Sequence, residues 1–171
     1  VSCFGGNNGS INLTVSGPNI PFTYLWNNNA TTQDLNNITA GVYSVIITNT
    51  LGCTTTQNIT ITQPPVGINA LANITHVNCH GANTGAIDVT VTGQTAPFQY
   101  SWSNGTGTQD LTNVLAGQYI LNVIDVNGCV FFDTFTVAQP AAALALQFNP
   151  SNVLCFNQLS GAVDLTVTGG T

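Results

Sequence analysis

Residues 1–64 return, without a gap, as residues 77–140. The two copies are identical at 27 of 64 aligned positions, and equivalent residues always differ by 76 in number. A third copy begins at the same step and covers less than half of a repeat before Thr171. Self-similarity at a fixed period indicates an array of one structural unit. Each unit must therefore fold within roughly 76 residues.

The repeat predicts three domains. Residues 1–64 are a first unit without its opening strand, residues 65–140 are a complete second unit, and residues 141–171 are the N-terminal part of a third. Domains of this size bury a small core and often depend on a covalent staple. We expect the chain to be part of a longer array of repeats. The missing parts of the first and third units are then supplied further along the same chain or by another copy.

Alternation of apolar and polar residues predicts β-strands throughout. Ile11, Leu13 and Val15 share one face of the first such segment, as expected of a half-buried strand. The predicted strands are 10–16, 21–26, 42–48 and 53–62, their equivalents 86–92, 97–102, 118–124 and 129–138, and 67–78. Short strands separated by regular turn signals are typical of a sandwich. The predicted fold is all-β, with tandem immunoglobulin-like antiparallel β-sandwich repeats stacked end to end.

Recurring aromatic residues predict the core of each unit. The tyrosine and tryptophan of the predicted strand 21–26 alternate along it and recur in 97–102, and each unit also contains a pair of cysteines at the same separation. This recurrence favours packing in the core over stacking on a sugar ring. The predicted core aromatics are Tyr24, Trp26, Tyr43, Tyr100, Trp102 and Tyr119.

The charge balance excludes several classes of partner. The chain has no Lys or Arg and six acidic residues, all Asp, for a net charge of −6. Without cations it cannot neutralise phosphates, so we expect no nucleic-acid binding. A polybasic attraction to anionic lipids is excluded for the same reason. No apolar run approaches the length of a membrane-spanning helix, so we expect no membrane insertion.

Cysteine usage predicts a disulfide in every unit. The preferred pairing is Cys3 with Cys53 and Cys79 with Cys129, and Cys155 is expected to have its partner outside the chain. Closing such a loop stabilises a domain by on the order of 4 kcal/mol. Metal ligation is the alternative, but two cysteines per unit without a regular histidine lack the ligands of a zinc site. Disulfides indicate an oxidising, extracellular setting.

Few residues suggest chemistry of another kind. Asp110 and Asp125 are weak calcium candidates, because hard cations need more carboxylates than this chain brings together, and hydrogen bonding within turns is the competing interpretation. His80 stands where the other units have Phe4 and Phe156, which favours a structural role. No catalytic constellation, cofactor site or firm metal site is predicted, so we expect no enzyme.

The combined motifs resemble the SprB-type repeat of Bacteroidota surface proteins. The pattern comprises an early Cys, Gly-x-Ile-x-Val-Thr-Val-x-Gly, Pro-Phe/Tyr-x-Tyr-x-Trp, Thr-Gln-Asp-Leu, Ala-Gly-x-Tyr, Asn-Gly-Cys and Gln-Pro, and the second unit carries nearly all of it. The first unit departs at 49–52, where Asn-Gly is absent. The resemblance implies very large filamentous cell-surface adhesins, some serving gliding motility and exported by the type IX secretion route, and nothing catalytic.

Three functional hypotheses follow. The preferred one is a structural stalk or filament segment of such an adhesin, with neighbouring repeats of the same chain and other copies in a filament as partners. The alternatives are an array of carbohydrate-binding modules and an accessory region of a large secreted enzyme. Repeated binding sites should repeat their contact residues, yet residues 17–20 read Gly-Pro-Asn-Ile where 93–96 read Gly-Gln-Thr-Ala. This difference favours the stalk.

Overall fold

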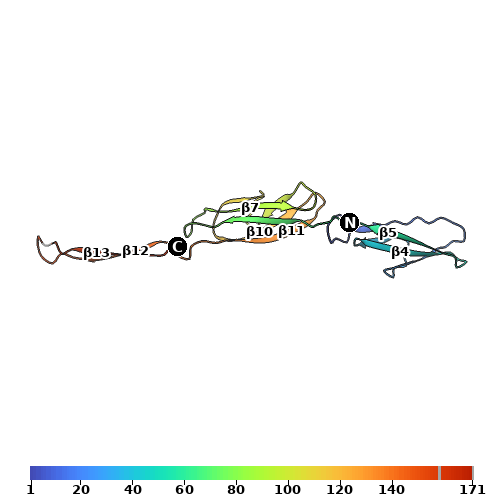
Figure 1. The fold of residues 1–171 in the computed structure, drawn as a ribbon, viewed down its shortest axis with the longest axis horizontal. Coiled ribbons are helices and arrows are strands. Elements are labelled where there is room, and N and C mark those ends of the chain that lie inside the picture. Colours follow the sequence, from blue (N-terminus) through green and yellow to red (C-terminus); the bar gives the residue numbers. More distant parts are fainter. Residues whose placement is uncertain (158, 171) are drawn as a thin grey trace. The chain divides into compact units, whose positions relative to one another are not determined.

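A computed structural model describes residues 1–157 and 159–170 (Figure 1). Residues 158 and 171, which belong to the predicted third unit, lie outside the described residues. The described part contains strands and no helix, and therefore no helix that could cross a membrane. The strands are β1 (Gly9–Ile11), β2 (Thr23–Trp26), β3 (Leu35–Ile38), β4 (Gly41–Thr48), β5 (Thr54–Ile61), β6 (Asn69–Thr75), β7 (Gly85–Thr92), β8 (Gln99–Trp102), β9 (Leu111–Val114), β10 (Gly117–Ile124), β11 (Val130–Val137), β12 (Ala145–Ser151) and β13 (Ala162–Thr168).

The chain divides into two compact units. The first comprises Val1–Asn69 with the segments Thr92–Phe98 and Ile124–Phe131. The second comprises Ala70–Val91, Gln99–Val123 and Phe132–Thr171. This division follows contacts rather than sequence equivalence, so the predicted repeat boundaries after residues 64 and 140 stay a prediction.

Strands β1 to β5 form a first sandwich. One sheet has the order β1-β3 and the other has the order β2-β4-β5. Strands β4 and β5 lie side by side (Figure 1) and pair from Gly41 opposite Ile61 to Thr48 opposite Thr54. Side chains from both sheets bury one another because each strand is apolar on a single face. The resulting core consists of Ile11, Trp26, Leu35, Ile38, Val45 and Ile47.

Strands β6 to β11 form a second sandwich of the same plan. Its sheets have the orders β6-β7-β9 and β11-β10-β8. Its most deeply buried hydrophobic side chains are Val77, Ile87, Val89, Trp102, Leu111, Leu121, Val123 and Val137. The predicted fold class, all-β with antiparallel β-sandwich repeats, is confirmed.

The remaining strands form a hairpin. Strands β12 and β13 pair from Ala145 opposite Thr168 to Ser151 opposite Ala162 and make a two-stranded sheet (Figure 1). They are equivalent to β6 and β7. In the second sandwich, β7 also pairs with a third strand, β9. Every residue of β12 and β13 is exposed to solvent.

Two strands were not predicted, because their pattern is not period two. In β3 the buried residues are Leu35 and Ile38, three apart, and in β9 they are Leu111 and Val114. Between the buried ends, Asn37 has a φ of 55°, and its equivalent in β9 has a φ of 56°. Asparagine tolerates this left-handed conformation, which accompanies an irregular register in both ladders.

The first sandwich also has a shorter opening strand than predicted. Strand β1 has three residues, whereas its equivalent β7 has eight. Strand β7 pairs on one edge with β6, and among the described residues no strand takes the place of β6 beside β1. The predicted strand at 10–16 therefore ends at Ile11, because ladder partners are missing on that edge.

Candidate functional site

The recurring Thr-Gln-Asp segment holds the backbone just after β1 in the first sandwich. The Leu13 backbone N–H donates to Asp34 Oδ1 at 2.9 Å, and Gln33 Nε2 donates to the Leu13 carbonyl. Tyr24 donates its hydroxyl proton to Gln33 Oε1 at 3.1 Å. Two side chains thus replace a strand partner at this position and also hold the aromatic strand.

The second sandwich repeats these bonds. Val89 N–H donates to Asp110 Oδ1 at 2.8 Å, and Gln109 Nε2 donates to the Val89 carbonyl. Tyr100 donates to Gln109 Oε1 at 3.2 Å. Burial of the Tyr100 ring, and secondarily the nearby Asp110 carboxylate, raises the pKa of the Tyr100 phenol above its ordinary value. The Asp110 carboxylate thus accepts a hydrogen bond from the Val89 backbone amide and also lies near the Tyr100 phenol.

Both tryptophans are core residues. Trp26 and Trp102 are 1% and 4% exposed, and each indole N–H donates to a threonine carbonyl of the same segment, Thr32 at 2.8 Å and Thr108 at 2.9 Å. The Trp102 ring also packs against Phe135, with centroids 6.0 Å apart. Neither indole has a free face for stacking on a sugar.

All four predicted core tyrosines are half-buried. Besides Tyr24 and Tyr100, Tyr43 donates its hydroxyl proton to the Thr39 carbonyl at 3.0 Å, and Tyr119 donates to the Leu115 carbonyl at 2.9 Å. Each ring packs at the edge of the core, and its hydroxyl donates a hydrogen bond to a neighbouring loop or turn.

The closing turn between β10 and β11 is organised by Asp125, which is 4% exposed. Its Oδ1 accepts the Asn127 N–H at 2.9 Å and the Cys129 N–H at 2.8 Å. Asn49 makes the same two bonds in the first sandwich, each 3.0 Å long, to Leu51 and Cys53. A neutral amide performs the same role, so the turn does not require a charge.

The structure does not assemble the calcium candidates into a site. Asp110 and Asp125 both spend a carboxylate oxygen on backbone N–H groups. The described residues hold no group of three or more His, Cys, Asp or Glu side chains placed to share a metal ion.

The cysteine pairing predicted within each unit is wrong. Cys3 is bonded to Cys129, with the two Cα atoms 5.5 Å apart and 126 residues apart in sequence. The two turns meet directly, since Cys129 Sγ also lies 3.5 Å from the Ser2 carbonyl oxygen. Both cysteines belong to the first compact unit. Cys53, Cys79 and Cys155 are free and exposed in the described part of the chain.

Backbone approaches closely beside this bond. Gly93 has a φ of +81°, and a Cβ there would lie 2.0 Å from the Gly67 carbonyl oxygen. The adjacent Gln94 donates from Nε2 to the Val66 carbonyl at 3.0 Å and places Oε1 3.8 Å from Cys129 Sγ. Only glycine permits this contact, so the sequence at 93 is adapted to the segment at 66–67.

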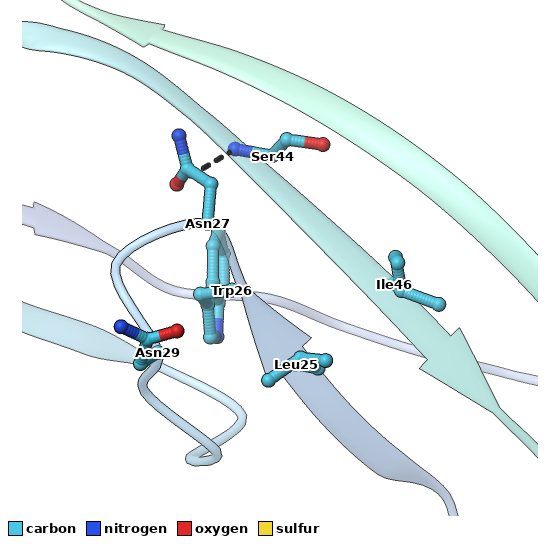
Figure 2. A pocket seen from close by; sticks show the side chains of 6 residues that line it. All are labelled: Leu25, Trp26, Asn27, Asn29, Ser44 and Ile46. Carbon is cyan, nitrogen blue, oxygen red and sulfur yellow. Dashed lines mark hydrogen bonds between the residues drawn. The ribbon is translucent and has the colours of Figure 1, made fainter.

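A shallow depression of about 200 Å³ opens on the first sandwich (Figure 2). Asn27 Oδ1 accepts the Ser44 N–H at 3.2 Å, and Leu25 stands opposite Ile46 on the paired strands β2 and β4. The lining residues are Leu25, Trp26, Asn27, Asn29, Ser44 and Ile46. In the second repeat, all but the tryptophan differ, being Ser101, Ser103, Gly105, Ile120 and Asn122. The depression is therefore not a repeated feature.

Two features of the structure do not follow from the sequence pattern. The Thr-Gln-Asp segment recurs, but period-two patterns carry no signal for side chains that bond a strand's backbone. The cysteine partners do not follow because a step of 76 fits a bond within a repeat and a bond between repeats equally well.

Comparison with known families identifies a matching repeat. A family model described as SprB repeat matches residues 1–31, 71–107 and 148–171, which together exceed half of the chain. Each match contains the first cysteine of a repeat, at Cys3, Cys79 and Cys155, and none reaches a closing turn. No curated protein matches the chain.

Proposed function

Because the chain belongs to the SprB repeat family, we propose that it is a structural segment of a large secreted cell-surface adhesin. The family is a structural adhesin repeat and not an enzyme family. In the proposed role the repeats form a stalk or filament that spaces an adhesive part from the cell. The finer assignments, namely surface attachment or gliding motility and export by the type IX route of Bacteroidota, belong to the same proposal.

The observation that carries this proposal is the internal use of the recurring residues. The Thr-Gln-Asp side chains bond the backbone of Leu13 or Val89, and the tryptophans donate to carbonyls of the same segment. A repeat that serves as a building block keeps the residues that hold it together. A repeat that serves as a binding module would keep exposed contact residues.

The carbohydrate-binding alternative finds no comparable support. The depression in Figure 2 loses five of its six lining residues in the next repeat, and its tryptophan is buried. Aromatic platforms for sugars must expose a ring face.

A glycan array probed with the 171-residue chain tests the proposal. We expect no glycan to bind above background. Dose-dependent binding that is lost in Leu25→Ala, at an exposed position of the depression, would overturn the structural assignment. Leu115→Ala, equally exposed but outside the depression, is the matched control and should leave any binding unchanged.

A further inference from the structure

The Cys3–Cys129 bond joins two kinds of turn that recur in the array. The opening turn carries the first cysteine of a repeat, here Cys3. The closing turn carries the second, here Cys129. Because the bond spans 126 residues, and 126 is one repeat of 76 plus the 50 residues between the two cysteines of a repeat, it connects an opening turn to the closing turn of the following repeat.

The free Cys79 lies in an opening turn built like that of Cys3. In the bonded turn, Gly6 N–H donates to the Cys3 carbonyl at 3.0 Å, and Gly5 N–H donates to Gln63 Oε1 at 2.8 Å. In the free turn, Ala82 N–H donates to the Cys79 carbonyl at 3.0 Å, and Gly81 N–H donates to Gln139 Oε1 at 2.8 Å. Gly5 and Gly81, at equivalent positions, have φ values of +70° and +76°.

The free Cys53 lies in a closing turn built like that of Cys129. Asn49 N–H donates to the Cys53 carbonyl at 3.0 Å, as Asp125 N–H does to the Cys129 carbonyl at 3.0 Å. Gly52 and Gly128 have φ values of +83° and +79°. Both kinds of turn therefore have the same backbone geometry whether or not their cysteine is bonded.

The two closing turns differ in what covers them. Cys129 is 5% exposed where Ser2 and Gln94 lie against its sulfur, whereas Cys53 is exposed. Cys53 also lines an open pocket of about 240 Å³ with the apolar side chains of Val15, Pro18 and Phe22. By the repeat step this pocket is the place at which an opening turn would dock.

We propose that Cys79 and Cys53 each take part in a junction bond of the Cys3–Cys129 kind, two separate bonds made with two different neighbouring SprB repeats. Cys79 bonds the closing-turn cysteine of the repeat that follows, and Cys53 bonds the opening-turn cysteine of the repeat that precedes. Every junction of the array then carries one disulfide, and consecutive repeats are covalently linked in addition to the backbone. The bond does not depend on the role proposed above for the array.

The chemistry is a two-electron oxidation. The two thiols lose two protons and two electrons as the sulfur–sulfur bond forms, and a small-molecule disulfide such as oxidised glutathione accepts them and leaves as two thiols. An extracellular setting supplies oxidants of this class.

Two extended chains test the proposal. In the first, a second copy of residues 96–140 follows Thr171 and completes the third repeat at the same step of 76. The copy of Val126, an exposed residue, is changed by Val126→Ile so that its peptides differ in mass. In the second, a copy of residues 1–76, with Ser2→Thr in the copy as its mass label, precedes Val1 and supplies the preceding repeat.

Each chain is refolded in a glutathione redox buffer, its free thiols are alkylated, and peptic peptides are analysed by mass spectrometry without reduction. Pepsin is needed because the chain has no Lys or Arg for trypsin. We expect Cys79 to bond the copied Cys129 in the first chain and Cys53 to bond the copied Cys3 in the second. Cys155 should be alkylated in both chains, which controls for indiscriminate oxidation.

In the 171-residue chain, Cys53, Cys79 and Cys155 should all be alkylated. Alkylation of Cys79 in the first extended chain, alkylation of Cys53 in the second, or a bond between Cys53 and Cys79 in either would overturn the proposal.

Discussion

Asp125 shows how a single residue can look like a ligand and act as a turn cap. Its Oδ1 holds the Cys129 and Asn127 N–H groups, while Oδ2 is buried without a hydrogen-bond partner among the described residues. A buried oxygen without a partner contributes no hydrogen bond to the turn. The bonds of Asn49 in the equivalent turn show that only the first oxygen is needed.

The change in the free energy of unfolding on substitution of Asp125 should therefore depend on whether the new side chain accepts a hydrogen bond and not on its charge. Asp125→Ala leaves the buried Cys129 N–H without an acceptor and should lower the free energy of unfolding by about 1–3 kcal/mol. Asp125→Asn keeps the acceptor and should change it by less than about 1 kcal/mol. Urea denaturation measures both, with Asp88→Ala at an exposed position as the control. Equal losses in the two Asp125 variants would contradict this assignment.

Tyr100 should make the protein sensitive to alkaline pH. Burial and the Asp110 carboxylate raise the pKa of its phenol in the folded state, so the folded state holds this proton more tightly than the unfolded state. The resulting stabilisation is complete below the ordinary tyrosine pKa of about 10 and is lost as the pH rises through the folded-state value. Urea midpoints across this range, with free thiols blocked, should fall more steeply for the native chain than for Tyr100→Phe. Parallel slopes would show that Tyr100 is not the responsible group.

At the scale of strands, the regular part of the fold follows from the sequence and the irregular part does not. Alternation along β7 and β10 predicts their burial because every second side chain faces the core. Strands β3 and β9 escape prediction because a left-handed asparagine, at Asn37 and Asn113, moves the buried positions three apart. The cysteine partners escape prediction because periodicity identifies equivalent residues but not the repeat in which a partner lies.

The segment beside the disulfide should tolerate no side chain at Gly93. A Cβ there would overlap the Gly67 carbonyl oxygen, at 2.0 Å, in addition to the cost of a φ of +81°. Gly105 has a φ of +85°, and no atom lies within 4 Å of the place that an added methyl group would take. Gly105→Ala therefore isolates the backbone cost, about 1–2 kcal/mol. Urea denaturation should show a clearly larger loss for Gly93→Ala, and equal losses would mean that the close approach to Gly67 is absent in solution.

Across the whole molecule, the sheets differ in how much of their surface is buried. The second sandwich has both of its sheets, whereas β12 and β13 form a two-stranded sheet whose residues are all exposed. Exposed apolar side chains on this hairpin include Leu146, Phe148 and Leu165. Two strands without a covered face are at best marginally stable in water.

Amide hydrogen exchange should resolve this difference. The amides of β12 and β13 should exchange rapidly, because few buried contacts oppose local opening, whereas β10, with Leu121 and Val123 fully buried, should be strongly protected. Protection of β12 and β13 equal to that of β10 in a monomer would show that another part of the chain covers the hairpin.

The disulfide map of the 171-residue chain distinguishes bonds between repeats from bonds within a repeat. The structure bonds the opening turn of a repeat to the closing turn of the next repeat and not to its own closing turn. Alkylation of the oxidised chain, peptic digestion without reduction and mass spectrometry should yield a Cys3–Cys129 peptide pair and alkylated Cys53, Cys79 and Cys155. Peptide pairs joining Cys3 to Cys53 and Cys79 to Cys129 would contradict it.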